Sequence, residues 1–391
     1  MANEHIGRLQ KVGLGKESTA GTPVSATAWL PKVSGVFRPE FGKAKDMSAY
    51  GNIDQLRDSQ TVKQMTIVEI EAIARDVYLG HFLMAALGSD TLCLRMTLGT
   101  VSGTFALGET ITQAVSSATG VIEAVDGSGA SQILHVSITS GTFTSASNQI
   151  TGGTSGATAI PTFDNTVRTH LFERLNTNNH PSYTLYGVDP VGDYRAAYGM
   201  LDTLDLECAV GDFLKITSTW KAKKEASTSS SPSYTEENEF MAIEADVYFA
   251  DSIAELDSAT ATPLERVKIT IQKNLEDYQA FGDTDISSIH NKQFTVVGDL
   301  TALFNSTTLK DYVVNSTKKA MRVEFVSSAS IGSGSNPRLR IDLASCAFES
   351  WERDSDNDAL VRQTLGFECE FSVDDSETMH VLLQNTQTTA Y

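Results

Sequence analysis

Alternating hydrophobic and polar positions dominate the informative parts of the sequence. Residues 201–208 place Leu204, Leu206 and Cys208 between acidic residues, and residues 364–373 repeat this period of two. Because successive side chains of a strand point to opposite faces, such alternation is typical of half-buried antiparallel strands. The same pattern predicts strands in the ranges 67–73, 266–272, 321–325 and 338–344. The chain is therefore predicted to be mainly β.

Two segments have helical periodicity instead. Residues 76–87 begin at Asp76, a residue type that caps helix N-termini, and are followed by Gly88, which favours a helix end. Residues 305–314 place Leu309 and Tyr312 on one helical face. Each predicted helix follows a predicted strand and precedes further strands in a similar order. We therefore predict that one structural unit occurs twice along the chain.

The first unit is lengthened by an almost uncharged segment rich in Gly, Ser and Thr, residues 96–163. Within it Gly103-Thr104-Phe105 recurs as Gly141-Thr142-Phe143, and further matches keep nearly the same spacing. Regular Val, Ile and Phe positions between glycines favour short strands joined by tight turns. The same composition is compatible with a flexible low-complexity linker. We favour a small β-domain inserted after the first helix.

These patterns divide the chain into five predicted parts. They are an extended N-terminal arm, a first β unit in two pieces, the inserted β-domain, a flexible linker or loop, and a second β unit. Their bounds are, in that order, residues 1–50, residues 51–95 with 164–223, residues 96–163, residues 224–239 and residues 240–391. The arm and the loop from Phe41 to Gln60 have few apolar residues. They are expected either to order against a neighbouring molecule or to be ordinary surface loops.

Charge and cysteine content limit the classes of function. Acidic residues outnumber basic ones 49 to 30, giving a formal net charge of -19 at pH 7. A surface that clamps nucleic acid needs clustered Lys and Arg, so it is not expected. No apolar run approaches the length of a membrane span, and the first fifteen residues lack the core of a signal peptide. The four cysteines are isolated, which favours reduced thiols, and Cys208 and Cys369 fall on the apolar sides of strands.

No motif predicts catalysis, a cofactor or a metal site. Gly13–Ser18 looks like part of a phosphate loop, but Glu17 stands where a magnesium-binding hydroxyl is required. Asp354–Asp358 begins like a calcium loop, yet Ala359 replaces the expected Gly and Leu365 the final Glu. A polar hairpin loop is favoured there, and weak cation binding stays open. The seven histidines lack the spacing of a zinc site.

In the order of its segments the chain resembles the major tail tube proteins of long, non-contractile-tailed bacteriophages. The resemblance is carried by "GLGKESTAGTPVSATAWLPK", "YGNIDQLRD", "YLGHFLMAALG", "HPSYTLYGVD" and "YGMLDTLDLECAVGDFLKITSTWKAK". It implies two tandem tail-tube-type β-sandwich or barrel units, each with one short helix. The Gly/Thr-rich insertion is similar to small β-domains common in phage structural proteins. The family implies a structural protein of the virion tail, assembled in the host bacterial cytoplasm, with no enzymatic activity and no cofactor.

The resemblance also implies partners. The chain would assemble with itself into stacked rings, three two-unit chains being favoured over six chains, and contact tape-measure and tail terminator or tip proteins. DNA would pass through the channel transiently and without specificity during ejection. Carboxylates facing the channel would repel phosphates. Candidates on the polar faces of the long strands are Asp205, Glu207, Glu368 and Glu370, for which a solvated outer face is the alternative. The alternative function is a phage surface or decoration protein whose inserted β-domain binds a host glycan or protein.

Overall fold

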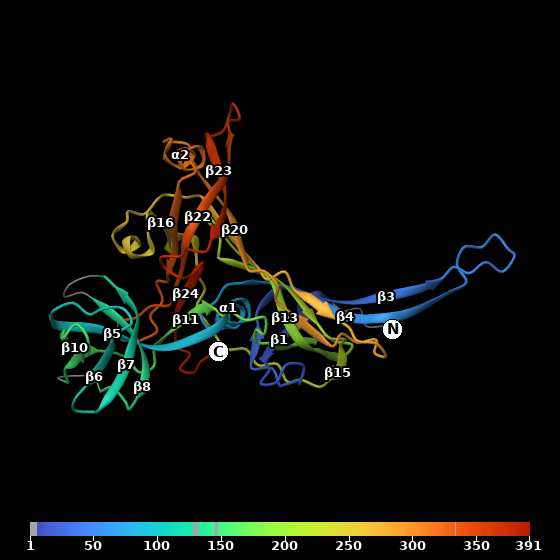
Figure 1. The fold of residues 1–391 in the computed structure, drawn as a ribbon, viewed down its shortest axis with the longest axis horizontal. Helices are drawn as coiled ribbons and strands as arrows, with labels where there is room; N and C mark the ends of the chain where they lie inside the picture. The colour runs from blue at the N-terminus through green and yellow to red at the C-terminus, as the bar shows by residue number, and fades with distance from the viewer. Residues whose placement is uncertain (1–5, 128–131, 145–147, 333) are drawn as a thin grey trace.

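The fold is built almost entirely from antiparallel strands. A computed structural model describes residues 6–127, 132–144, 148–332 and 334–391. In it, 22 strands belong to one hydrogen-bonded network, and two short strands pair separately. Figure 1 shows an elongated molecule with the strands of the predicted insertion at one end and a long hairpin projecting at the other. The mainly β class predicted from the alternation is confirmed.

The elements have the following bounds. The N-terminal half contains β1 (Lys11–Lys16), β2 (Ala28–Leu30), β3 (Lys32–Asp46), β4 (Asp58–Ile73), α1 (Leu79–Leu87), β5 (Gly88–Ser102), β6 (Thr110–Gln113), β7 (Ala118–Asp126), β8 (Ile133–Ser140), β9 (Ile150–Gly152), β10 (Thr158–Thr162), β11 (Arg168–Arg174), β12 (Tyr183–Val188), β13 (Asp193–Ala209), β14 (Lys215–Ala222) and β15 (Ala226–Thr228). The C-terminal half contains β16 (Ala245–Ala250), β17 (Arg266–Gln272), β18 (Glu276–Tyr278), β19 (Ser288–His290), β20 (Thr295–Leu303), α2 (Thr308–Val314), β21 (Lys318–Val326), β22 (Arg338–Asp354), β23 (Arg362–Glu370) and β24 (Met379–Asn385). Short 3₁₀ turns cover Gly7–Leu9, Ala242–Glu244 and Ile253–Ser258.

One sheet, which we call the principal sheet, runs through both halves of the chain. Its strands follow the order β3–β4–β14–β13–β17–β20–β23–β22. The first four strands come from the N-terminal half and the last four from the C-terminal half. Both sets have the same order across the sheet: a first strand, the strand that precedes the helix in sequence, the strand that follows the long strand in sequence, and the long strand of 17 residues itself. These are β3, β4, β14 and β13 in the first set and β17, β20, β23 and β22 in the second. The repeated order of elements in the sequence thus has a counterpart in the order of paired strands.

The core lies on one face of the principal sheet. The register places Leu204 opposite Ile271 and Leu206 opposite Ile269, so the apolar positions of β13 and β17 share a face. Helix α1 covers this face, and the ring of its Phe82 lies 6.0 Å from the buried ring of Trp220 in β14. Burying one such large side chain contributes roughly 1.5–3 kcal/mol. The alternation read from the sequence is therefore the pattern of a sheet that is buried on one side.

Both helices are shorter than predicted. Helix α1 begins at Leu79, and Asp76 does not cap it, because the Asp76 carboxylate accepts hydrogen bonds from the backbone N (3.0 Å) and Nδ2 (2.8 Å) of Asn238. Gly88 ends the helix at φ 95°, as predicted, in the left-handed region that glycine adopts easily. Helix α2 covers only Thr308–Val314.

The last strand of the alternating pattern also ends earlier than predicted. Strand β23 stops at Glu370, and Phe371 and Val373 are exposed. The chain turns at Ser372, whose Oγ donates a 2.7 Å hydrogen bond to Asp375. Alternating apolar residues beyond Glu370 therefore do not enter the sheet.

The segments expected to be an extended arm and a flexible linker or loop both contribute strands to the sheet network. Residues 1–50 supply β1, β2 and β3, and Val12, Leu14 and Leu30 are fully buried. Residues 224–239 include β15, which pairs with β13, and end in contacts with the start of α1. The sequence signal was too weak because the buried positions stand among glycines and polar residues. The tip of the β3–β4 hairpin, residues 47–57, carries no strand.

The glycines of the apparent phosphate loop allow close packing instead. Gly13 lies in β1, where a Cβ atom would stand 2.8 Å from the ring of Trp29. Glu17 is buried, and its carboxylate accepts hydrogen bonds from Ser182 Oγ (2.7 Å) and Thr184 Oγ1 (2.8 Å). These contacts join β1 to β12, so the segment has a structural role.

The doubled segment has a hydrophobic core of its own, formed by the apolar residues of β5–β10 and their connections. Phe105 and Phe143, which end the repeated Gly-Thr-Phe motifs, are both buried in it. Each motif packs against the other copy, because a Cβ on Gly103 would contact Ala157 and a Cβ on Gly141 would contact Ala118. The internal repeat is therefore a reciprocal packing arrangement, which a flexible linker would not form.

Candidate functional site

The four acidic residues singled out from the sequence lie on β13 and β23 of the principal sheet. Asp205 is opposite Thr270, which is opposite Val297, which is opposite Glu368, so Asp205 and Glu368 lie in one row across four strands. Their parity is opposite to that of the buried residues, and they are partly exposed. We call this side of the sheet the polar face.

Basic residues on neighbouring strands accompany most of these carboxylates. Lys268 Nζ lies 3.1 Å from Asp205, and Arg266 Nε lies 2.7 Å from Glu207. Arg266 also pairs with Asp299. At the end of β23, Glu370 pairs with Lys318 of β21.

The sequence did not predict that basic residues on other strands form ion pairs with these carboxylates. Arg266 and Lys268 occupy alternate positions of the strand predicted at 266–272, but their partners depend on the strand order. Partly exposed pairs of this kind contribute little stability, typically below about 1 kcal/mol each. Their main effect is that the cations of the polar face are already held by carboxylates.

The principal sheet ends in two edges that have no partner strand among the described residues. One is the outer edge of β3, which pairs only with β4. The other is the C-terminal part of β22, Phe348–Asp354, where β23 occupies one side and β21 pairs only as far as Ala347. Val33 and Val36 on β3 are 57% and 44% exposed. Unpaired backbone groups with apolar side chains are a template for pairing with another chain.

Comparison with β13 shows what is missing beside β22. Along one edge of β13 lie β14 and then β15, and along the other lie β17 and β12. Strand β22 has β23 and then β24 on one edge, and β21 on the other. Among the described residues, no strand occupies the position beside Phe348–Asp354 that corresponds to β17. By the repeated strand order, the N-terminal counterpart of β17 is β3.

Exposed apolar side chains gather at the tip of the projecting hairpin. Met47, Tyr50, Ile53 and Leu56 lie between β3 and β4, where the chain extends beyond the sheet (Figure 1). Phe281, between β18 and β19, is also fully exposed. The β3–β4 hairpin and the β18–β19 hairpin are joined through their strands, since Lys63 of β4 pairs with Asp277 of β18. Exposed apolar groups of this kind mark interaction surfaces.

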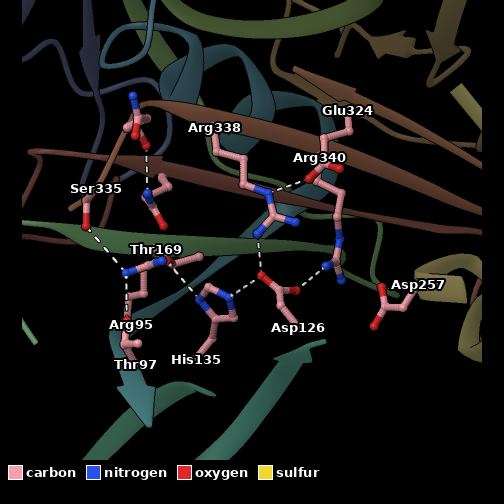
Figure 2. Close-up of polar contacts among 12 residues, drawn as sticks. Arg95, Thr97, Asp126, His135, Thr169, Asp257, Glu324, Ser335, Arg338 and Arg340 are labelled. Carbon is pink, nitrogen blue, oxygen red and sulfur yellow. Dashed lines mark hydrogen bonds and ion pairs between the residues drawn. The ribbon is translucent and has the colours of Figure 1, made fainter. Parts of the chain in front are cut away.

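A buried group of charged residues joins the inserted strands to the C-terminal half (Figure 2). Asp126 of β7 accepts a 3.0 Å hydrogen bond from His135 of β8 and pairs with Arg338 and Arg340 of β22. Arg340 and Arg322 both pair with Asp342, which also contacts His380 of β24. We call this group the ionic seam; it consists of Asp126, His135, Arg322, Arg338, Arg340, Asp342 and His380.

Electrostatics in the ionic seam follow from burial and pairing. Burial opposes ionisation of Asp126, but His135 and the two arginines outweigh it and hold the pKa of Asp126 well below its usual range. Burial lowers the pKa of His135, so the ring is neutral near pH 7. Its Nε2–H then donates to Asp126, and its Nδ1 accepts from Thr169 Oγ1 at 2.9 Å. Asp126 and His135 are unusual as ionisable residues in an almost uncharged segment, which is the one sequence signal for this contact.

His380 gives the ionic seam a pH-dependent part. Burial would lower its pKa, but hydrogen bonds to Asp342 and Glu377 raise the pKa of His380 to about 9. Because the folded pKa exceeds the ordinary value of about 6.5, the stabilisation is complete below that value and is lost as pH rises through about 9. We expect the free energy of unfolding of the wild type to exceed that of His380→Gln most near pH 6. The excess should fall by roughly 3 kcal/mol by pH 10.

Chemical denaturation of both proteins at several pH values would measure this difference. His290→Gln is the matched control, because His290 hydrogen-bonds Ser288 Oγ at 2.9 Å and has no carboxylate partner in an ion pair of the described structure. It gives the effect of replacing a histidine that forms no such ion pair. If the free energies of unfolding of His380→Gln and the wild type change with pH in parallel, the assigned role of His380 is contradicted.

The structure also shows where the inserted strands can be removed. Thr97 of β5 and Thr162 of β10 are directly opposite each other in the register. A two-residue Asn-Gly turn is suited to joining such positions. We expect a variant with this turn in place of residues 98–161 to remain folded, because Arg338 and Arg340 become hydrated when the whole segment leaves. Circular dichroism and electron microscopy would test whether a folded deletion variant still forms the assemblies of the wild type.

Metal binding and membrane insertion find no support in the described part of the chain. No group of three or more His, Cys, Asp or Glu side chains there is placed to hold a metal ion. The carboxylates of Asp354–Asp358 lie at the exposed end of β22 and in the connection that follows it. All four cysteines are buried and free, as expected for small apolar side chains. None of the helices in the described ranges is long and apolar enough to cross a membrane.

Comparison with known proteins agrees with this architecture. The family model described as "Phage tail tube protein" matches residues 7–369. The match therefore covers both sets of four strands in the principal sheet, the inserted strands and most of the ionic seam. The search of curated proteins gives no significant match.

Proposed function

Because the chain belongs to the phage tail tube protein family, it is a structural component of a bacteriophage virion tail, and we propose that three copies close into one ring of the tube. The observation that carries this proposal is the pair of complementary free edges of the principal sheet. Each chain contributes eight strands in two similar sets of four. Three chains would give a ring with six similar sets.

Ring closure would follow the junction that already exists inside the chain. Strand β13 pairs with β17 over Thr203–Ala209, which joins the two sets of four strands. We propose that Phe348–Asp354 of β22 pairs in the same way with β3 of the next chain. Such a contact is heterologous, since different surfaces meet, and rotation of each chain relative to the last closes it into a ring. Backbone hydrogen bonds would supply affinity, and the exposed valines would fix the position.

The projecting β3–β4 hairpin supports stacking of one ring on the next. Its tip carries Met47, Tyr50, Ile53 and Leu56 beyond the end of the sheet. An isolated chain would leave these side chains in water, whereas a stacked ring would cover them. We propose that they pack against a neighbouring ring and that the rings build an open tube.

The polar face would line the channel, because the other face is covered by α1 and the core. Asp205, Glu207, Glu368 and Glu370 would then face passing DNA. The cations beside them are held in ion pairs, so they are poor anchors for phosphates, and the net charge of -19 opposes lasting contact. This combination suits transient, non-specific passage of DNA during ejection into the host. Assembly in the host cytoplasm, with tape-measure and tail terminator or tip proteins, would complete the tail.

Electron microscopy of the concentrated, purified protein tests the proposal. We expect stacked hollow rings, and native mass spectrometry of an isolated ring should give the mass of three chains of 42.2 kDa. A ring of six chains would overturn the stoichiometry while leaving the tube intact. A persistent monomer would contradict assembly and favour a surface or decoration protein whose inserted β-domain binds a host glycan or protein.

A further inference from the structure

A cavity of about 280 Å³ lies at the junction between the two halves of the chain. One wall is the connection between β11 and β12 in the N-terminal half, and the other is formed by the residues that flank β18 and β19 in the C-terminal half. Its polar lining includes Arg174, Asn176, His180, Lys273, Asn291 and Lys292. None of its lining residues is acidic, although the chain carries a net charge of -19. Lys292 is paired with Glu276 at 3.2 Å, so Arg174 and Lys273 are the cations of this cavity that have no carboxylate partner in the described structure.

Lys273 is the most deeply buried cation of this cavity. It continues the parity of Val267, Ile269 and Ile271, so it points to the core side of the principal sheet and is only 1% exposed. Its Nζ donates to Ala85 O at 2.8 Å, near the end of α1. No carboxylate of the described residues lies within ion-pair distance of this ammonium group. A buried ammonium group without a counter-ion is costly, because burial favours the neutral form.

Asp202 is the acidic residue that acts on Lys273, but its carboxylate does not form an ion pair with Lys273 in the described structure. Burial lowers the pKa of Lys273 to about 7, with Asp202 acting in the opposite direction. The Asp202 carboxylate is engaged elsewhere, since it accepts a 2.9 Å hydrogen bond from the backbone N of Leu275 and lies 3.2 Å from Lys221 Nζ. An anion in the cavity would supply the missing negative charge.

In the described structure the Asn291 side chain lacks hydrogen-bond partners, and Arg174 contacts Asn176 and the ring of Phe294, whose centroid lies 5.8 Å from its guanidinium carbon. Both side-chain polar atoms of Asn291, Oδ1 and Nδ2, are buried with no hydrogen bond in the described structure. Arg174 forms a long 3.4 Å contact with Asn176 Oδ1 and has no carboxylate partner in the described part of the chain. Buried polar groups in proteins are nearly always paired, so the two unpaired atoms of Asn291 beside this space indicate an absent ligand or water. His180 donates Nε2–H to Leu175 O at 2.9 Å, and burial lowers its pKa to about 4, so it contributes no charge.

We propose that this cavity binds a small oxyanion of the phosphate type, held by Lys273, Arg174 and the Asn291 amide. The bound anion would link the two halves of the chain and stabilise their junction. The phosphate groups of DNA in the channel are not the ligand, because Lys273 points away from the polar face. The inference does not depend on ring formation, since all of the groups belong to one chain.

Thermal unfolding of the full-length protein in inorganic phosphate, against sodium chloride of equal ionic strength, tests this inference. A ligand that binds only the folded state raises the unfolding temperature in a saturable way. We expect such a rise for the wild type. Isothermal titration calorimetry with phosphate should show affinity at least tenfold weaker for Arg174→Gln and Lys273→Met. Lys45→Met, at an exposed lysine of the projecting hairpin, removes the same charge and should bind phosphate as the wild type does.

Both Arg174→Gln and Lys273→Met are used, so that the proposal is still tested if one of them does not fold. Lys273 also contacts α1, so its substitution affects the core, whereas Arg174 is half-buried at the cavity wall. Unchanged phosphate affinity in folded Arg174→Gln would overturn the proposal. So would a wild-type response that is identical in chloride and phosphate.

Discussion

Replacing Val33 and Val36 together by lysine is expected to abolish tube formation while leaving a folded, monomeric protein. Both residues belong to the edge strand β3, have side chains that are 57% and 44% exposed, and lie outside the hydrophobic core clusters. Charged side chains on an edge strand oppose pairing with another chain, because the approaching strand would have to desolvate them. Electron microscopy would show the loss of tubes, and size-exclusion chromatography would show the monomer.

The matched control for this double variant carries the same substitutions away from the free edge. Val115 and Val191 are exposed on connections outside the principal sheet. Their replacement by lysine adds the same charge and should leave tubes unchanged. If the Val33→Lys/Val36→Lys variant forms tubes as long as those of the wild type, β3 is not the ring-closing edge.

Replacing Asp126 by asparagine is expected to destabilise the folded chain by about 3–5 kcal/mol. Asp126 is 7% exposed and balances Arg338 and Arg340. Asparagine keeps the shape but removes the charge, so the two buried guanidinium groups would keep only their pairs with Glu324 and Asp342 among the described ion pairs, and Asp342 is shared with Arg322. Removing one member of a buried ionic group costs far more than removing the group as a whole, because an uncompensated charge remains. Urea denaturation, followed by tryptophan fluorescence, would measure the loss.

Asp212→Asn is the control for this substitution. Asp212 forms an ion pair with Lys215, and both side chains are exposed. Water hydrates the lysine after the substitution, so the urea midpoint should hardly change. Equal midpoints for Asp126→Asn and the wild type would mean that the ionic seam does not fasten the inserted strands to β22.

The comparison with the deletion variant adds a test of mechanism. Replacing residues 98–161 by a two-residue turn removes Asp126 as well, but it also uncovers Arg338 and Arg340. Water then replaces the carboxylate. We therefore expect the single substitution to lower the urea midpoint further than the large deletion does, which an additive count of lost contacts would not predict.

Much of the secondary structure could be predicted from local pattern alone. The strand expected at 266–272 coincides with β17, and Gly88 ends α1 as its conformational freedom suggests. Period-two alternation survives in the fold because one face of the principal sheet is buried and the other is not. The pattern failed at Phe371 and Val373, where a local turn at Ser372 withdraws apolar residues from the sheet.

The inserted segment shows how far a repeat can be interpreted before the fold is known. The sequence shows that Gly-Thr-Phe occurs twice, but not that each glycine accommodates an alanine of the other copy. That reciprocal contact arises because Gly103 packs against Ala157 and Gly141 packs against Ala118, which lie in different copies of the repeat. Likewise, Asp126 and His135 stand out as ionisable residues, whereas the partners of Asp126 on β22 lie more than two hundred residues away.

The sequence by itself determined the mainly β class, the position of both helices, the doubled order of elements and the family resemblance. These depend on short-range periodicity and residue type, which a chain carries wherever it folds. The tertiary structure alone decided the strand order, the ion pairs of the polar face, the free edges on β3 and β22, and the cavity around Lys273. Each of these depends on which distant backbone segments pair, and alternation is the same for every partner that a strand could choose.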